Sequence, residues 1–137
     1  MTIEQIPSER HDEIRSVYSS VEYKGGITDE DRGFLASIEG KPVGAVRLCI
    51  EDGVLVLRGM MIDPAYQRQG IGTALLKALD PAIGNRRCYC INPPHLKPFY
   101  GSIGFVEIEK KDAPSFLVER LESLDRELVI MMREKKI

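Results

Sequence analysis

Few residues in this sequence could bind a transition metal. It has three cysteines, Cys49, Cys88 and Cys90, and two histidines, His11 and His95. All three cysteines fall in segments that we expect to be strands. Cys88 and Cys90 are two positions apart, so they would point to the same face of a strand and be poorly placed to form a disulfide with each other. The sequence therefore predicts buried, reduced thiols and no metal site.

Long apolar runs and a strong excess of charge of one sign are also missing. No run approaches the roughly 20 apolar residues that span a bilayer, so we expect no membrane partner. The formal net charge is −2, which disfavours a nucleic-acid-binding surface. Residues 1–15 are too charged for a secretory signal. These absences predict a cytoplasmic protein that binds neither membrane nor nucleic acid.

No linker, internal repeat or low-complexity segment divides the chain. Its 137 residues are enough to bury an apolar core without disulfides or metals. Hydrophobic residues make up 43% and charged residues 29%, values ordinary for a globular protein. We therefore expect one domain over residues 1–137.

The most informative stretch runs from Val54 to Leu79. Its first part, Val54 to Ile62, is apolar and β-branched and stops at Asp63-Pro64, which predicts a buried strand. The last part predicts an amphipathic helix, because its apolar residues fall at helical spacing: Ile71, Ala74, Leu75, Ala78 and Leu79.

A polar loop with two glycines, residues 67–73, lies between this strand and this helix. The first amides of a helix have no carbonyl partner and carry partial positive charge, and glycines let an anion approach them closely. This arrangement predicts a phosphate-binding loop. A P-loop is excluded because Gly72 is followed by Thr73-Ala74 and not by Lys-Ser/Thr. A dinucleotide fingerprint is disfavoured because Leu75 stands where a third small residue is needed.

Two motifs resemble the GNAT superfamily of N-acetyltransferases. Gln67-x-x-Gly70-x-Gly72, after Ile62-Asp63-Pro64-x-Tyr66, is similar to that family's acetyl-CoA signature, Val-x-Pro-x-x-Arg/Gln-x-x-Gly-x-Gly/Ala. The segment Phe99 to Phe105, FYGSIGF, is similar to its Phe/Leu-Tyr-x-x-x-Gly-Phe motif. The two occur in the family's order and at about its separation. The resemblance implies an α/β (α+β) fold: a mostly antiparallel sheet of six or seven strands, helices on both faces, and a splayed parallel strand pair at the cofactor site.

The resemblance also implies which residues contact the cofactor. Acetyl-CoA would be the co-substrate, with its diphosphate on the loop, its pantetheine arm along the central strand, and Tyr100 as the general acid that protonates the leaving thiolate. Gly59 would mark a bulge that opens the strand, although it could instead relieve local crowding. The cofactor-binding residues implied in this way are Met60, Met61, Ile62, Gln67, Arg68, Gln69, Gly70, Ile71, Gly72, Thr73 and Asn92.

Two features depart from the family pattern. Many relatives carry a glutamate on the central strand, where this chain has Arg58-Gly59-Met60. Glu22 and Glu51 are the candidates for a general base, and the alternatives are deprotonation through water or a substrate that arrives as a neutral amine. The spacing from Asn92 to Tyr100 is also one residue longer than usual.

The resemblance thus implies transfer of an acetyl group from acetyl-CoA to a primary amine of a small molecule or peptide, through a tetrahedral intermediate. The alternative is a CoA-binding sensor or partner-binding module without turnover. By this resemblance Glu22, Tyr23 and Lys24 would lie at the mouth of the acceptor pocket, although they could instead form a solvated loop. The protein would be a monomer or a homodimer.

The remaining elements follow from periodicity and turn residues. We expect an edge strand over Met1 to Ile6, a helix from Pro7-Ser8, and a short second helix capped by Thr28 to Asp31. Asp80-Pro81 and Gly84-Asn85 should end the central helix. A helix opened by Pro114 should turn Leu117, Leu121 and Leu124 to the core, and the last strand should span Leu128 to Met132.

Overall fold

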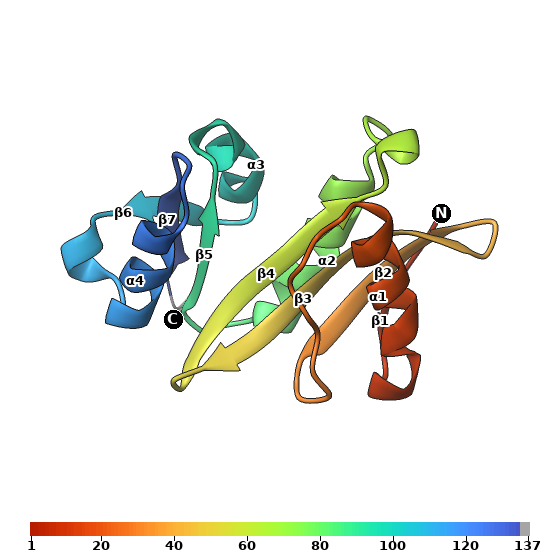
Figure 1. Ribbon diagram of the computed structural model, residues 1–137, viewed down its shortest axis with the longest axis horizontal. Helices are drawn as coiled ribbons and strands as arrows, with labels where there is room; N and C mark the ends of the chain where they lie inside the picture. The colour runs from red at the N-terminus through yellow and green to blue at the C-terminus, as the bar shows by residue number, and fades with distance from the viewer. Residues whose placement is uncertain (135–137) are drawn as a thin grey trace.

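A mixed β-sheet runs through the molecule in the computed structural model, which describes residues 1–134 (Figure 1). The described residues form seven strands in the order β1-β2-β3-β4-β5-β7-β6. Neighbouring strands are antiparallel except for β4 and β5, which are parallel. The strands are β1 (Thr2–Ile6), β2 (Arg32–Ile38), β3 (Lys41–Glu51), β4 (Val54–Ile62), β5 (Cys88–Asn92), β6 (Phe105–Ile108) and β7 (Val129–Arg133).

Helices cover both faces of this sheet, as predicted. They are α1 (His11–Ser20), α2 (Ile71–Ile83), α3 (Lys97–Gly101) and α4 (Ser115–Ser123), with 3₁₀ turns η1 (Ser8–Arg10), η2 (Pro64–Tyr66), η3 (Pro94–Leu96) and η4 (Lys110–Asp112). Apolar side chains of α2 and α3 pack with one face of the sheet, around Val46, Leu48 and Leu57. Those of α1 pack with Leu35 and Ala45 on the other face, where α4 covers Val56.

The first four strands form a meander, and short turns set its register. Asp52 and Gly53 have φ values of +51° and +74°, the left-handed pair that favours a two-residue hairpin, and they join Glu51 to its partner Val54. This hairpin leads the chain into β4, the strand that contacts the second half of the sheet. The central strand is therefore confirmed with its predicted bounds, Val54 to Ile62.

One helix prediction was wrong and another was confirmed only in part. No helix follows Thr28, because the Thr28 amide donates to the Asp31 carboxylate (2.9 Å) and the Asp31 amide donates back to the Thr28 carbonyl (3.1 Å), which closes a turn directly before β2. Of the two predicted stop signals of α2, Asp80-Pro81 does not end the helix, which continues to Ile83, whereas Gly84 is its C-cap as predicted. A proline removes one amide donor, and burial of Ile83, which is 1% exposed, holds the last turn on the sheet.

The C-terminal elements correct two further details. Helix α4 ends at Ser123, so Leu124 lies outside it and is 40% exposed, whereas Leu117 is fully buried. Strand β7 begins one residue later than predicted and lies between β5 and β6. Its apolar run is therefore explained by a place inside the sheet.

The three cysteines are buried free thiols, as predicted. Burial raises the pKa of Cys49 to about 11 and that of Cys88 to about 12, so both stay protonated at neutral pH. Within residues 1–134, no cluster of three or more histidine, cysteine, aspartate or glutamate side chains could hold a metal ion. None of the helices described is long and apolar enough to cross a bilayer.

Candidate active site

The parallel pair β4 and β5 separates after two residue pairs. Leu55 lies opposite Cys88 and Val56 opposite Tyr89, and beyond them the strands have no shared register although β4 continues to Ile62. Figure 1 shows the two strands diverging toward the end at which α3 lies. The backbone of β4 beyond Val56 therefore has an edge that no neighbouring strand covers.

A bulge in β4 coincides with this separation. On the β3 side, Arg47 pairs with Arg58 and Ala45 pairs with Met61, so two residues of β4, Gly59 and Met60, face the single residue Val46. Gly59 has a φ of +67°, and a Cβ at this position would lie 2.3 Å from the Tyr18 hydroxyl. Glycine is therefore required here both for the bulge and for close packing, which joins the two explanations that the sequence left open.

The glycine loop leads into the N-terminus of α2. Arg68 and Gly70 have φ values of +65° and +78°, which turn the backbone sharply before the helix. The first helical bond runs from the Ala74 amide to the Gly70 carbonyl (3.0 Å). The preceding amides of the helix start have no carbonyl within reach in α2 and lie at the positive end of its dipole.

An open cleft of about 650 Å³ joins this loop to the edge of β4. Ten of the twelve residues that the sequence predicted for the site line it: Met60, Met61, Ile62, Gln67, Arg68, Gly70, Ile71, Gly72, Thr73 and Tyr100. Gln69 lies in the same loop but does not line the cleft, and Asn92 lines a neighbouring cavity instead. The fold thus brings the two sequence motifs, which are about 30 residues apart in the chain, to one cleft.

Tyr100 lies where this cleft meets a second cavity of about 450 Å³, and it lines both. Its ring packs edge-to-face against Phe99 and Phe105, with ring centroids 5.0 and 6.3 Å away, which fixes its orientation. Within the described part of the chain its hydroxyl makes no hydrogen bond. Burial raises the pKa of this phenol above its ordinary value of about 10, so it is protonated at neutral pH.

The second cavity lies between the diverging strands and is bounded by parts of the chain that are distant in sequence. Met60, Met61, Leu96 and Tyr100 are shared with the first cleft. Its other walls are Tyr23, Gly25, Val56, Leu57, Arg58, Gly59, Ile91, Asn92, Pro93, Arg120, Leu124, Arg126 and Leu128. The cavity contains three arginines, and none of the residues lining it is acidic.

Asn92 is 2% exposed and already engaged within the protein. Its side-chain amide donates to the Pro93 carbonyl (3.0 Å), and its carbonyl oxygen accepts from the Cys90 thiol (3.4 Å). It therefore shapes the wall of the second cavity.

A buried arginine holds Tyr23 at that wall. Arg47 is 2% exposed and donates through one guanidinium nitrogen to the hydroxyls of Tyr18 (3.2 Å) and Tyr23 (3.3 Å). Its Nε lies 3.7 Å from the Asp31 carboxylate. Of the three residues predicted at the mouth, Tyr23 lines the second cavity, whereas Glu22 and Lys24 line neither that cavity nor the first cleft.

Neither candidate base, Glu22 or Glu51, lines the first cleft or the second cavity. Glu51 hydrogen bonds to Arg120 and lies 3.3 Å from Arg58. Burial alone would raise the pKa of Glu51, but these two guanidinium groups outweigh burial and keep it below the ordinary range. Glu51 is therefore a weak base tied to two cations.

Sequence reasoning missed the arginines of the second cavity. Arg58 is distinguished in the sequence only by standing where relatives carry a glutamate. Arg120 and Arg126 lie in and after α4, more than 60 residues away from Arg58. No motif marks them. Only the fold of the sheet, which places α4 over Val56, could have placed them beside β4.

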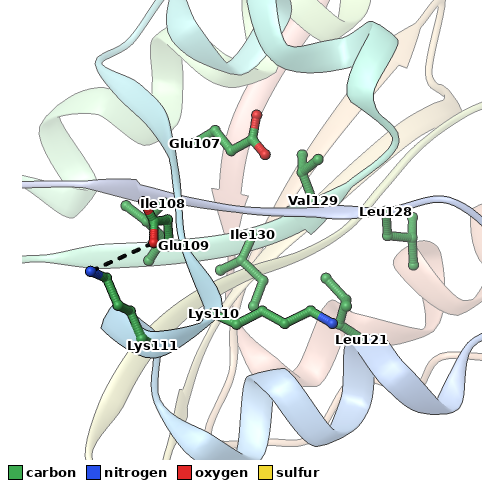
Figure 2. Close-up of a pocket in the computed structure, with 9 residues that line it drawn as sticks. All are labelled: Glu107, Ile108, Glu109, Lys110, Lys111, Leu121, Leu128, Val129 and Ile130. Carbon is green, nitrogen blue, oxygen red and sulfur yellow. Dashed lines mark ion pairs between the residues drawn. The ribbon is translucent and has the colours of Figure 1, made fainter.

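A third hollow, of about 410 Å³, lies between β6, β7 and α4 (Figure 2). Glu109 and Lys111 form an ion pair at its edge (3.7 Å), and Lys110 pairs with Glu122 (3.3 Å). Of its lining residues only Leu128 also lines the second cavity. The lysines of this hollow are thus paired with carboxylates, and it lies apart from the glycine loop.

Comparison with known proteins identifies the family. The acetyltransferase (GNAT) domain matches residues 29–107 of this chain, more than half its length. The chain therefore belongs to the GNAT family of acetyltransferases, a family of acyltransferases that use CoA thioesters. The predicted family and fold are both confirmed.

Solved structures share the whole fold at low sequence identity. Escherichia coli ElaA has a TM-score of 0.68 and 16% identity, over 97% of this chain and 99% of that protein. The ribosomal-protein-S18-alanine N-acetyltransferase from Escherichia coli has a TM-score of 0.71 and 18% identity, over 99% of this chain and 94% of that protein. An aminoglycoside 6'-N-acetyltransferase crystallised with coenzyme A has a TM-score of 0.70 and 13% identity, over 97% of this chain and 96% of that protein. No curated protein matches the chain significantly in sequence.

Proposed function

We propose that this protein transfers an acetyl group from acetyl-CoA to a primary amine of a small molecule or peptide. The observation that carries the proposal is the position of Tyr100, a protonated phenol without a hydrogen-bond partner in the described chain, where two cavities meet beside an open strand edge. The first cleft can hold the thioester, and the second cavity can hold the amine. A protein that only bound CoA would have no use for a proton donor at this junction.

The first cleft has the groups that CoA requires. The amides from Arg68 to Thr73 and the Arg68 side chain suit a diphosphate, because backbone donors and helix-terminal charge favour anions. Met60, Met61 and Ile62 offer backbone groups along the open edge of β4 to the pantetheine arm. The CoA complex of the aminoglycoside acetyltransferase with the same fold supports this choice of co-substrate.

The reaction then needs few groups from the protein. The neutral amine attacks the thioester carbonyl carbon, a C–N bond forms, and the oxyanion of the tetrahedral intermediate is stabilised by amides of β4. The C–S bond breaks, the thiolate takes the Tyr100 proton, and the nitrogen loses its proton to solvent, from which Tyr100 is reprotonated. Holding donor and acceptor side by side lowers the activation barrier most, by on the order of 7–11 kcal/mol.

The amine is deprotonated without a carboxylate base. No acidic side chain lines the second cavity, whereas three arginines do. Neighbouring positive charge disfavours an ammonium ion and lowers its pKa. Of the alternatives left open by the sequence, we therefore favour an acceptor that binds as the neutral amine.

A thiol-release assay tests this function. Acetyl-CoA is incubated with the protein and a panel of cationic, neutral and anionic primary amines, and CoA formation is followed together with the acetylated product. We expect release that depends on an amine and produces one acetamide per CoA. Calorimetric binding of CoA without release on any amine would contradict the proposal and leave the CoA-binding module.

A further inference from the structure

The second cavity is strongly cationic for its size. It is lined by Arg58, Arg120 and Arg126. Within the described chain, Glu51 is the one carboxylate paired with any of these arginines, so the three arginines and Glu51 together carry a formal charge of +2. The Arg58 and Arg120 side chains are partly buried, 33% and 27% exposed, and both contact Glu51. Positive charge in a partly enclosed cavity is screened less by salt than charge on open surface.

Arg126 differs from the other two arginines. It lies between α4 and β7, its side chain is exposed, and it forms no ion pair or hydrogen bond within residues 1–134. Its planar guanidinium can bind a carboxylate through two parallel hydrogen bonds. An arginine that lines a cavity and has no partner in the described protein is available for a ligand.

We infer that the acceptor is a small amino carboxylate, an amine whose own carboxylate binds Arg126 and the neighbouring arginines. This inference rests on the proposed function and specifies its substrate class. The volume of about 450 Å³ holds a molecule of amino-acid size, and the cavity reaches from Arg126 to Tyr100. The carboxylate is bound at the cationic wall while the amine points to the junction with the first cleft.

The same charges explain which amines are excluded. A polyamine or an aminosugar with several ammonium groups would bring further positive charge next to three arginines without any carboxylate on the lining. Like charges in close contact oppose binding. The cavity thus selects against polycationic acceptors.

The test compares matched acceptors that differ in one charge. Acetyl transfer is measured with the common amino acids and with their carboxamides, at equal concentrations of neutral amine because an amide lowers the pKa of its α-amine. We expect kcat/KM for at least one acid to exceed that for its amide by 10-fold or more, and the preference to weaken at high salt. O-phosphoethanolamine and ethanolamine form a second pair, in which a phosphate replaces the carboxylate.

Substitution of Arg126 locates the effect. Arg126→Gln should reduce the ratio of kcat/KM for the acid to kcat/KM for the amide by about 10-fold, mainly through KM. Arg126→Lys should restore part of this ratio, because lysine keeps the charge but lacks the two parallel donors of the guanidinium. Arg15→Gln is the control, since Arg15 is an exposed arginine of α1 that lines none of the three cavities. It should leave the ratio unchanged.

Each outcome separates the inference from the function. Turnover of amides, polyamines or O-phosphoethanolamine in preference to every amino carboxylate would overturn the inference and leave the acetyltransferase. An equal loss on acids and amides in Arg126→Gln would also overturn it. Absence of turnover with every amine, while CoA still binds, would overturn the proposed function and the acceptor class together.

Discussion

At the scale of single residues, Tyr100 is the group whose loss should affect chemistry and little else. The Tyr100→Phe variant keeps the ring that packs against Phe99 and Phe105 and removes a hydroxyl that has no partner in the described chain. We expect kcat to fall by about 100-fold or more, the usual effect of losing a general acid, with CoA affinity within about twofold. Steady-state kinetics and calorimetry measure the two quantities.

Tyr89→Phe is the matched control for this variant. Tyr89 is also buried, 6% exposed, but packs against α4 and lines none of the three cavities. The Tyr89→Phe variant should turn over as fast as the wild-type protein. A Tyr100→Phe enzyme as fast as the Tyr89→Phe enzyme would remove Tyr100 from the mechanism.

Individual residues were predictable where a motif contains them. The glycine loop and Tyr100 both belong to short sequence motifs. Each motif describes one local structure, a loop before a helix for the glycines and a short helix for Tyr100. Arg126 belongs to no pattern, and its importance depends on which cavity α4 and β7 border. A lone arginine between two elements gives no sequence signal, because charge on a connecting segment is usually solvated surface.

At the scale of elements, the bulge in β4 is the feature on which the open edge depends. Gly59→Ala adds a Cβ 2.3 Å from the Tyr18 hydroxyl and 2.4 Å from an Arg47 nitrogen, at a positive φ. Gly53→Ala has a similar φ, +74°, but nothing within 4 Å. Backbone strain is common to both, about 1–2 kcal/mol, and crowding is added only at Gly59, about 1–3 kcal/mol.

Urea unfolding should therefore show a larger loss of stability in Gly59→Ala than in Gly53→Ala, by at least about 1 kcal/mol. Acetyl transfer should fall in Gly59→Ala and stay near wild type in Gly53→Ala. Equal stability and equal rates in the two variants would mean that the bulge is dispensable.

Glu51 joins three elements, since it lies at the end of β3 and bonds to Arg58 of β4 and Arg120 of α4. Its pKa is lowered in the folded protein, so its ionised form stabilises the fold above the unfolded pKa near 4.5, and this contribution is lost as pH falls through the folded pKa. We expect Glu51→Gln to lower Tm at pH 7 and to have a smaller effect as the pH is reduced below 4.5. Thermal unfolding across this range measures the difference, and a constant difference at all pH values would contradict the ionic link.

Elements were predictable where local sequence decides them. The hairpin at Asp52-Gly53 and the amphipathic face of α2 are examples. The predicted helix after Thr28 failed because a reciprocal bond with Asp31 favoured a turn. The predicted end of α2 was confirmed at Gly84-Asn85 and not at Asp80-Pro81, because burial of Ile83 outweighed the missing amide bond.

At the scale of the whole molecule, the site is the opening between two halves of one sheet. β1 to β4 form one side, and β5 to β7 with α3 and α4 form the other (Figure 1). The parallel arrangement of β4 and β5 follows from a strand-helix-strand crossover. The point at which they separate depends on the bulge, the loop and the packing on both faces, and no local pattern in the sequence contains it.

The central claim is that CoA lies in the first cleft, with its diphosphate on the amides that begin α2. The most direct measurement is a titration of the ¹⁵N-labelled chain with unlabelled CoA, followed by backbone amide chemical shifts. If CoA lies there, we expect saturable shifts at Gln69 to Thr73 and at Met60 to Ile62, with little change at the Glu39-Gly40 turn. Two results would contradict this position of CoA: amide chemical shifts of the glycine loop that do not change at saturating CoA, or shifts that are largest at the hollow between β6 and α4.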